Sequence, residues 1–196
     1  LSLHPSVLRV LFNNLRFNNS KKFFDDEIFS MFKVMLMTAE DNKSLKLMNL
    51  MGVLSKLIPE FSRIIAQAQF DKYHIYTVDL HTLKALEIIK SIQFRKNKNA
   101  NYSFVSDIFH KIENLEPLLF SVLLHDIGKG RSKKIHKDGI YDTDLITRRM
   151  KFSNVESIEI KWLVKNHQFF SETAFKRDIE DEAIVRTFKR RIKSLE

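Results

Sequence analysis

The chain has 196 residues, 44% of them hydrophobic, and its 33 basic against 24 acidic residues give a formal net charge of +9. It contains no cysteine, which excludes disulfide frameworks, thiolate zinc sites and cysteine nucleophiles and is compatible with the reducing cytoplasm. Four glycines and three prolines are too few for the many turns of an all-β protein. A chain of this length predicts one domain or two small ones, with enough residues to bury a core.

The first half of the chain shows helical periodicity with short interruptions. We expect helices over five segments: the one after Pro5, then residues 23–38, 45–57, 61–69 and 78–94. Pro59 ends the third of these, because the residue before a proline avoids the helical conformation. The polar residues 95–101 predict a loop.

The most apolar helix predicted by the sequence ends in two polar residues. Pro117 opens the run of residues 118–124, and His125 and Asp126 follow it directly. Gly128 is a residue that commonly stops a helix, so the two polar side chains are expected at the helix terminus.

The last third of the chain also predicts helices. Ser153 and Glu156 have the spacing of a capping box and predict a helix that ends near His167, and a last helix is expected from about residue 179. No segment has the alternation of a strand, and no fixed-period repeat is present. The predicted fold class is therefore all-α.

No targeting or membrane segment is predicted. The longest strongly apolar stretch, residues 118–124, is far shorter than the roughly 18 residues that a membrane span needs, and the N-terminus lacks the layout of a signal peptide. We expect a soluble, cytoplasmic protein without a membrane partner. Because the chain starts at Leu1 and stops at Glu196 within a helical pattern, we also expect it to be a piece of a longer protein.

The excess positive charge is spread along the chain. Short basic clusters lie at residues 129–134 and 186–193, but neither is accompanied by an aromatic RNA-binding motif. We therefore do not expect nucleic acid as the main partner. A phosphorylated or acidic substrate needs only one local cluster.

Three residues suggest a metal site. His81 lies near the start of a predicted amphipathic helix, in line with apolar residues, so its imidazole is expected to point inward. His125 and Asp126 end the most apolar helix, where a carboxylate is costly to bury unless a cation lies against it. A divalent ion supplies that charge and accepts both imidazole and carboxylate ligands. The alternatives are a helix-terminal pair satisfied by backbone and water, and a core histidine bonded to a carbonyl.

Five further segments make the signal more specific. They are residues 58–61 (IPEF), 76–83 (YTVDLHTL), 124–131 (LHDIGKGR), 162–167 (WLVKNH) and 172–178 (ETAFKRD). Together with His81 and the His125–Asp126 dyad, they resemble the HD-domain phosphohydrolase superfamily. Within it they are most similar to the HD domain of the bacterial bifunctional uridylyltransferase/uridylyl-removing enzymes, and the resemblance runs over nearly the whole chain.

This resemblance implies an HD-domain helical bundle over residues 61–196, preceded by a helical lead-in over residues 1–60. It implies metal-dependent phosphodiester hydrolysis that removes UMP from the uridylylated PII nitrogen-regulatory protein. The expected cofactor is a divalent metal, Mn²⁺ or Mg²⁺, with Fe or Zn as alternatives. The expected site residues are the metal ligands His81, His125, Asp126, His136 and His167 and the catalytic residues Asp126, Lys129 and Arg131.

Some of these assignments have alternatives. His136 and His167 either complete a second metal site or are ordinary surface or helix-end histidines, and Lys129 and Arg131 either neutralise a phosphodiester or are merely solvated. The superfamily's last aspartate ligand is expected beyond Glu196. In the full-length protein, the resemblance implies a nucleotidyltransferase domain and ACT domains. The competing functions are hydrolysis of small nucleotides and a catalytically incomplete helical regulatory module.

Overall fold

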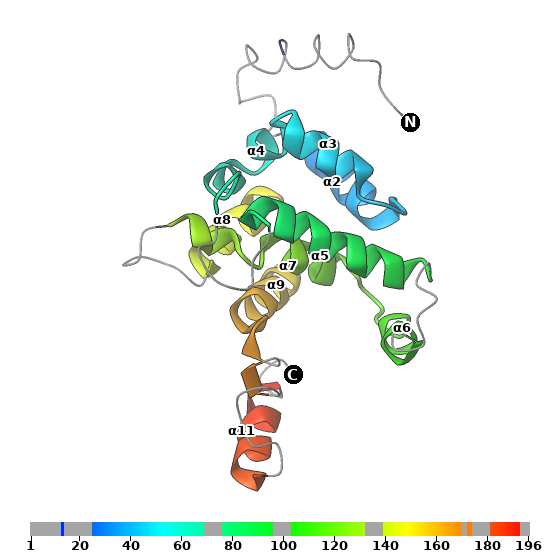
Figure 1. Ribbon diagram of the computed structural model, residues 1–196, viewed down its shortest axis with the longest axis vertical. Helices are drawn as coiled ribbons and strands as arrows, with labels where there is room; N and C mark the ends of the chain where they lie inside the picture. Colours follow the sequence, from blue (N-terminus) through cyan, green and yellow to red (C-terminus); the bar gives the residue numbers. More distant parts are fainter. Residues whose placement is uncertain are drawn as a thin grey trace.

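The computed structural model describes residues 25–68, 76–95, 103–131, 139–169, 172–173 and 181–192, together with residue 13. All regular structure in these residues is helical, and none of them lies in a strand (Figure 1). The predicted all-α class is therefore confirmed. Among the helices described, none is both long and apolar enough to cross a membrane.

The first described elements are short and closely connected. They are α2 (Asp26–Thr38), α3 (Lys43–Leu50), α4 (Val53–Leu57) and the 3₁₀ helix η2 (Pro59–Arg63). The prediction of one continuous helix over residues 45–57 is wrong, because Gly52 has a φ of 72° and divides it. The helix predicted from residue 61 is also wrong in type, since η2 ends at Arg63 and turns follow it.

The remaining elements carry the site. They are α5 (Val78–Gln93), α6 (Ser103–Phe109), α7 (Glu116–Leu124), the 3₁₀ helix η4 (Ile127–Gly130), α8 (Ile140–Arg149), α9 (Asn154–Asn166) and α11 (Glu182–Ile192). The predictions for α5, α7 and α9 are confirmed, including the capping box of Ser153 and Glu156. Sequence patterning did not predict α6 or α8.

One apolar core joins the early helices to the later ones. Helix α7 packs against α2, α5 and α9, and α8 packs against α9 and η4. The core contains fully buried side chains from both halves of the chain, among them Leu36, Leu54, Phe61, Leu83, Leu86, Phe120, Leu123, Ile146 and Ile160. Because α7 is buried on nearly every side, its C-terminal end is held rigidly inside the bundle.

A buried lysine connects α5 to the end of α2. Lys90 is 1% exposed, and its ammonium donates hydrogen bonds to the carbonyl oxygens of Leu36 and Met37. These carbonyls belong to the last turn of α2, where positive charge is favourable. Burial nevertheless lowers the pKa of Lys90 to about 8.

Helices α6 and α11 lie at the edge of the molecule. In Figure 1, α11 extends away from the body below α9. None of the residues of α11 is buried. Helix α11 therefore lies outside the main core, and its Arg191 lines the cavity at the candidate site.

Candidate metal centre

Three helix ends meet at one point of the structure. His81 lies in the first turn of α5, His125 is the C-terminal cap of α7, and His167 is the C-terminal cap of α9. Because α7 packs against both α5 and α9, these side chains come close to Asp126, the residue after His125. The start of α5 thus faces the ends of α7 and α9.

The carboxylate of Asp126 is the centre of this cluster. Its Oδ2 lies 3.3 Å from Nε2 of His125 and 3.8 Å from Nε2 of His81, and its Oδ1 lies 3.8 Å from Nε2 of His167. The rings of His81 and His167 are edge-on to that of His125, with centroids 5.2 and 5.1 Å from it. One ligand atom from each of His81, His125 and Asp126 lies within 4.8 Å of the others, so one ion can be bound by all three.

The two helix-terminal histidines are oriented in the same way. Nδ1 of His125 lies 2.8 Å from the carbonyl oxygen of Val122, and Nδ1 of His167 lies 2.7 Å from that of Val164. A carbonyl oxygen only accepts, so both Nδ1 atoms carry a proton and both Nε2 atoms face Asp126. Metal-binding histidines are commonly oriented by such a bond from the second ring nitrogen.

The environment of Asp126 fits a bound cation. Burial alone would raise the pKa of this carboxyl, but its contacts with His125 and Lys129 outweigh burial and hold the pKa well below its usual range. Nζ of Lys129 lies 2.8 Å from Oδ2, yet this buried oxygen accepts no hydrogen bond of normal geometry. A buried, ionised oxygen without a directional partner, surrounded by imidazole nitrogens, is a suitable ligand for a divalent metal.

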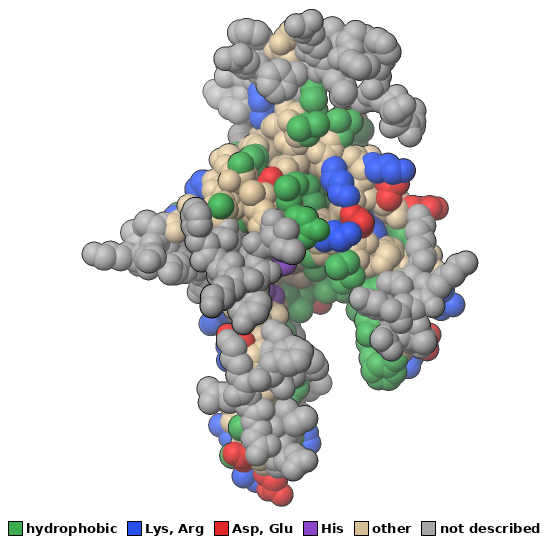
Figure 2. Space-filling view, viewed as in Figure 1, with side chains coloured by type: hydrophobic (Ala, Val, Ile, Leu, Met, Phe, Trp, Pro, Cys, Tyr) green, Lys and Arg blue, Asp and Glu red, His purple; other side chains and the backbone are tan. Residues whose placement is uncertain are grey.

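His167 has the properties of an additional ligand. Burial lowers its pKa, and this effect outweighs the hydrogen bond to Val164 and the charge of Asp126. The lowered pKa favours the neutral imidazole that a metal requires. The side chains of His81 and His167 are 36% and 31% exposed, so the cluster is accessible from solvent. Histidine surface is visible near the centre of the face shown in Figure 2.

A cavity of about 330 Å³ opens beside the cluster. His125, Asp126, Lys129 and His167 are among the residues that line it. The remaining lining includes charged side chains from α9 and from the segments beyond it: Lys165, Glu172 and Arg191. A volume of this size is typical of small-molecule sites.

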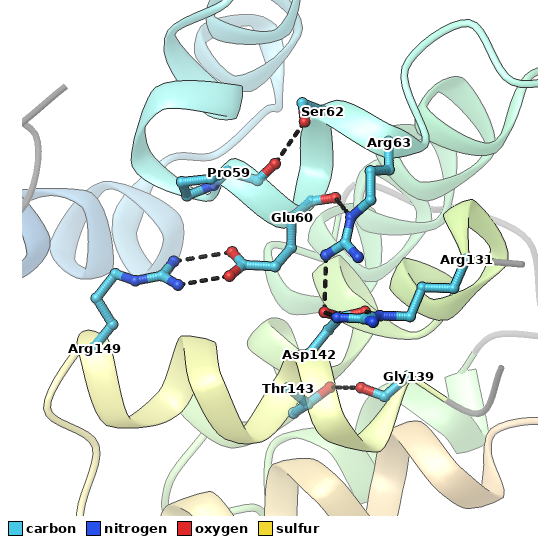
Figure 3. A network of polar contacts seen from close by, with 9 residues as sticks. All are labelled: Pro59, Glu60, Ser62, Arg63, Arg131, Gly139, Asp142, Thr143 and Arg149. Carbon is cyan, nitrogen blue, oxygen red and sulfur yellow. Dashed lines mark hydrogen bonds and ion pairs between the residues drawn. The ribbon is translucent and has the colours of Figure 1, made fainter. Parts of the chain in front are cut away.

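A second polar network lies next to the cluster (Figure 3). Asp142 of α8 is fully buried and accepts hydrogen bonds from Arg63 at 2.8 Å and from Nε and Nη2 of Arg131 at 2.7 Å each. Beside it, the carboxylate of Glu60 accepts two hydrogen bonds from Arg149, at 2.9 and 2.5 Å. Arg131 was expected to contact a substrate, but the structure pairs its guanidinium with Asp142 and does not bring it into the cluster.

This network fixes the turn that carries Lys129. The side-chain amide of Gln67 donates to the carbonyl oxygen of Lys129 at 2.9 Å. A Cβ atom at Gly130 would lie 2.6 Å from Cβ of Arg63, so only glycine allows η4 to approach η2 this closely. The backbone at Lys129 is thus fixed by these contacts, and its ammonium is held at the cavity by Asp126.

The structure therefore brings together five of the predicted site residues: His81, His125, Asp126, Lys129 and His167. His136 lies outside the described residues. Sequence reasoning missed Asp142 and Arg191 as neighbours of the site. No local pattern marks them, because each reaches its position only through packing between helices distant in the sequence.

The described helices thus form an all-helical domain that gathers histidines and an aspartate, residues able to hold a metal ion, at the ends of packed helices. A family model described as "HD domain" matches residues 78–192, and the chain belongs to this HD-domain family.

Curated relatives match the chain beyond residues 78–192. The whole chain is 36% identical to a protein of Azospirillum brasilense and 32% identical to one of Novosphingobium aromaticivorans, of which it covers 21% and 22%. A protein of Zymomonas mobilis is 40% identical over 78% of the chain, which is 16% of that relative. All three are named "Bifunctional uridylyltransferase/uridylyl-removing enzyme". The chain thus spans about a fifth of their length. No solved structure matches the chain.

Proposed function

We propose that this chain is the uridylyl-removing part of such a bifunctional enzyme and that it hydrolyses the phosphodiester bond between UMP and a tyrosine of the PII signalling protein. The observation that carries the proposal is the convergence of three helix ends on the buried carboxylate of Asp126. The matched relatives, whose name includes uridylyl removal, support the choice of reaction.

The ligands of the proposed metal come from the start of α5 and the end of α7. His81, His125 and Asp126 hold one divalent ion, and we propose His167 and His136 as ligands of a second, as the sequence resemblance implies. When bound, the ion supplies a more acidic water and polarises a phosphoryl oxygen. Mn²⁺ and Mg²⁺ are the ions that we propose, and Fe and Zn are alternatives that the histidine-rich donor set also suits.

Lys129 supplies positive charge for the substrate. Its ammonium, 2.8 Å from Asp126, faces the cavity in which the phosphodiester would lie. In the overall reaction, a bond forms between a water oxygen and phosphorus, the bond from phosphorus to the tyrosine oxygen breaks, and the phenol oxygen takes up a proton. Asp126 orients both the proposed metal and Lys129. Arg131 is paired with Asp142 and is therefore not among the proposed substrate contacts.

The proposal extends to the longer protein. We propose that residues 1–60 form a lead-in to an HD domain over residues 61–196, and that nucleotidyltransferase and ACT domains are present in the full-length protein. The fivefold greater length of the relatives supports such additional domains. A substrate such as PII and a chain without cysteine fit a cytoplasmic location.

Metal content and hydrolysis test this function in wild type, His125→Ala and His110→Ala. His110 is a matched control, because its Nδ1 also contacts a backbone carbonyl, that of Ser106 at 2.6 Å, but it lies at the exposed end of α6. After equilibration with Mn²⁺ and desalting, elemental analysis should find metal in wild type and His110→Ala but little in His125→Ala. Release of UMP from uridylylated PII should follow the same order.

The other outcomes separate the alternatives. Absence of bound metal both in this chain and in a form extended beyond Glu196 to include the expected last aspartate would overturn the catalytic proposal and favour a regulatory module. Bound metal with hydrolysis of small nucleotides but not of uridylylated PII would overturn the choice of substrate and favour a nucleotide phosphohydrolase.

A further inference from the structure

Arg191 of α11 is fixed at the cavity by contacts with the end of α9. Its Nε donates a hydrogen bond of 2.7 Å to Oδ1 of Asn166, and its guanidinium lies 4.3 Å from the centre of the Phe169 ring. Asn166 is itself fixed, since its Nδ2 donates to the carbonyl oxygen of Trp162 at 2.8 Å. The ring of Phe169 is stacked on Phe188 of α11 at 5.4 Å. The position of Arg191 is therefore defined by a polar and an aromatic contact.

These contacts place a cation in the lining of the cavity beside the metal cluster. Arg191 lines the same cavity as Asp126, Lys129 and His167. Asn166, which anchors it, directly precedes His167 in the chain. The anchor of Arg191 and one ring of the cluster thus belong to the same last turn of α9.

The charge in this cavity suits an anion. Lys129, Lys165 and Arg191 line it against the two carboxylates of Asp126 and Glu172, and a divalent ion at the cluster would add further positive charge. A guanidinium is better suited than an ammonium to bind two oxygens of one phosphoryl group, because its donors form a planar fork. The basic cluster of residues 186–193 therefore includes a side chain that is built into the site.

We propose that Arg191 binds the phosphoryl group of the uridylyl moiety, as a substrate-binding residue supplied by α11. This inference rests on the proposed function, because it assumes a nucleotidyl ester as the substrate. It assigns to α11 a direct part in recognition, in addition to that of Lys129.

The test compares Arg191→Ala and Arg191→Lys with Arg190→Ala. Arg190 lies on the same helix, is exposed and does not line the cavity. Because it is also an arginine, Arg190→Ala changes the net charge by the same amount as Arg191→Ala. The substrate is the p-nitrophenyl ester of UMP, an aryl ester like uridylyl-tyrosine. With Mn²⁺ present, kcat/KM should fall about 10- to 100-fold in Arg191→Ala, as expected for losing a hydrogen bond to a charged group. Arg191→Lys should recover part of this loss, and Arg190→Ala should resemble wild type.

Inhibition constants separate phosphate binding from a structural effect. UMP and inorganic phosphate should both inhibit Arg191→Ala more weakly than wild type, whereas inhibition by uridine should be unchanged. Equal weakening for uridine would overturn the phosphoryl assignment, and so would wild-type values for all three inhibitors. If wild type hydrolyses neither the ester nor uridylylated PII, the proposed function fails. Calorimetric titration of UMP into wild type and Arg191→Ala then still tests Arg191, because equal affinities would overturn its role.

Discussion

Replacing Asp142 by Asn should destabilise the protein strongly, because it removes the charge that neutralises two arginines. The Asp142 side chain is fully buried and accepts three hydrogen bonds, one from Arg63 and two from Arg131. Removing one partner of a buried ion pair typically costs about 3–5 kcal/mol. The two arginines are 32% and 22% exposed, so water recovers part of their solvation and the lower end of the range applies.

We therefore expect Asp142→Asn to lower the free energy of unfolding by about 3 kcal/mol. For a chain of this length, this corresponds to a fall in Tm of about 6–12 °C. Urea and thermal unfolding followed by circular dichroism measure both values. Asp144→Asn is the matched control on the same helix, because Asp144 is 26% exposed and pairs with Lys161 and Arg148. Such a surface carboxylate contributes about 1 kcal/mol or less.

The effect of Asp142→Asn should also depend on pH. Burial would raise the pKa of Asp142, but hydrogen bonds and charge from Arg131 and Arg63 outweigh it, so the pKa is lower in the folded than in the unfolded state. The stabilisation by this carboxylate is therefore complete above the unfolded pKa of about 4 and is lost as the pH falls through the folded pKa. A loss in Asp142→Asn equal to that in Asp144→Asn at pH 7, or a difference that does not shrink below pH about 4, would refute this reasoning.

Two further perturbations test the packing of the helices. Gly130→Ala should lower the free energy of unfolding in urea by about 2–3 kcal/mol, because its Cβ would lie 2.6 Å from Cβ of Arg63. Gly52→Ala is the control: no atom lies within 4 Å of its Cβ, but its φ is 72°, so it should lower the free energy of unfolding by only about 1 kcal/mol. A loss at Gly130 equal to or smaller than that at Gly52 would contradict the close contact. Lys90 has a folded pKa of about 8, below the unfolded value of about 10.4, so the unfolded chain binds more protons between these values and the stability of wild type relative to Lys90→Met should rise with pH across that window. A constant difference would show that the Lys90 ammonium is not desolvated.

The parts of the fold that the sequence predicted are those marked by local signals. Helix α9 begins at the capping box of Ser153, and α7 is recognisable from its continuous apolar run, so the ends of these helices were located correctly. Helix α8 lacks such a signal. Its buried positions include Asp142, Thr143 and Thr147, polar residues that pattern analysis assigns to a surface, and their burial depends on partners elsewhere in the chain.

The site was predictable to the same extent. His81, His125 and Asp126 were identified because a polar dyad at the end of an apolar helix requires a partner, and the structure brings them together. The pairing of Arg131 with Asp142 was not predictable, because a loop arginine has the same sequence pattern whether it binds a substrate or a buried carboxylate. Arg191 was seen only as one member of a basic cluster, since its contact with Asn166 joins residues 25 positions apart.

The position of His125 and His167 at the C-terminal ends of two packed helices limits where the chain tolerates insertions and deletions. Each imidazole ring donates a hydrogen bond to a carbonyl oxygen of its own helix, so the ring moves together with that helix. Adding or removing one residue within α9 rotates everything after that point by about 100° and shifts it by about 1.5 Å. His167 would then leave Asp126 while the buried face of α9 before the change stayed in place. Members of this family that retain the site should therefore keep the number of residues in α9 constant and place their length differences in the connecting loops.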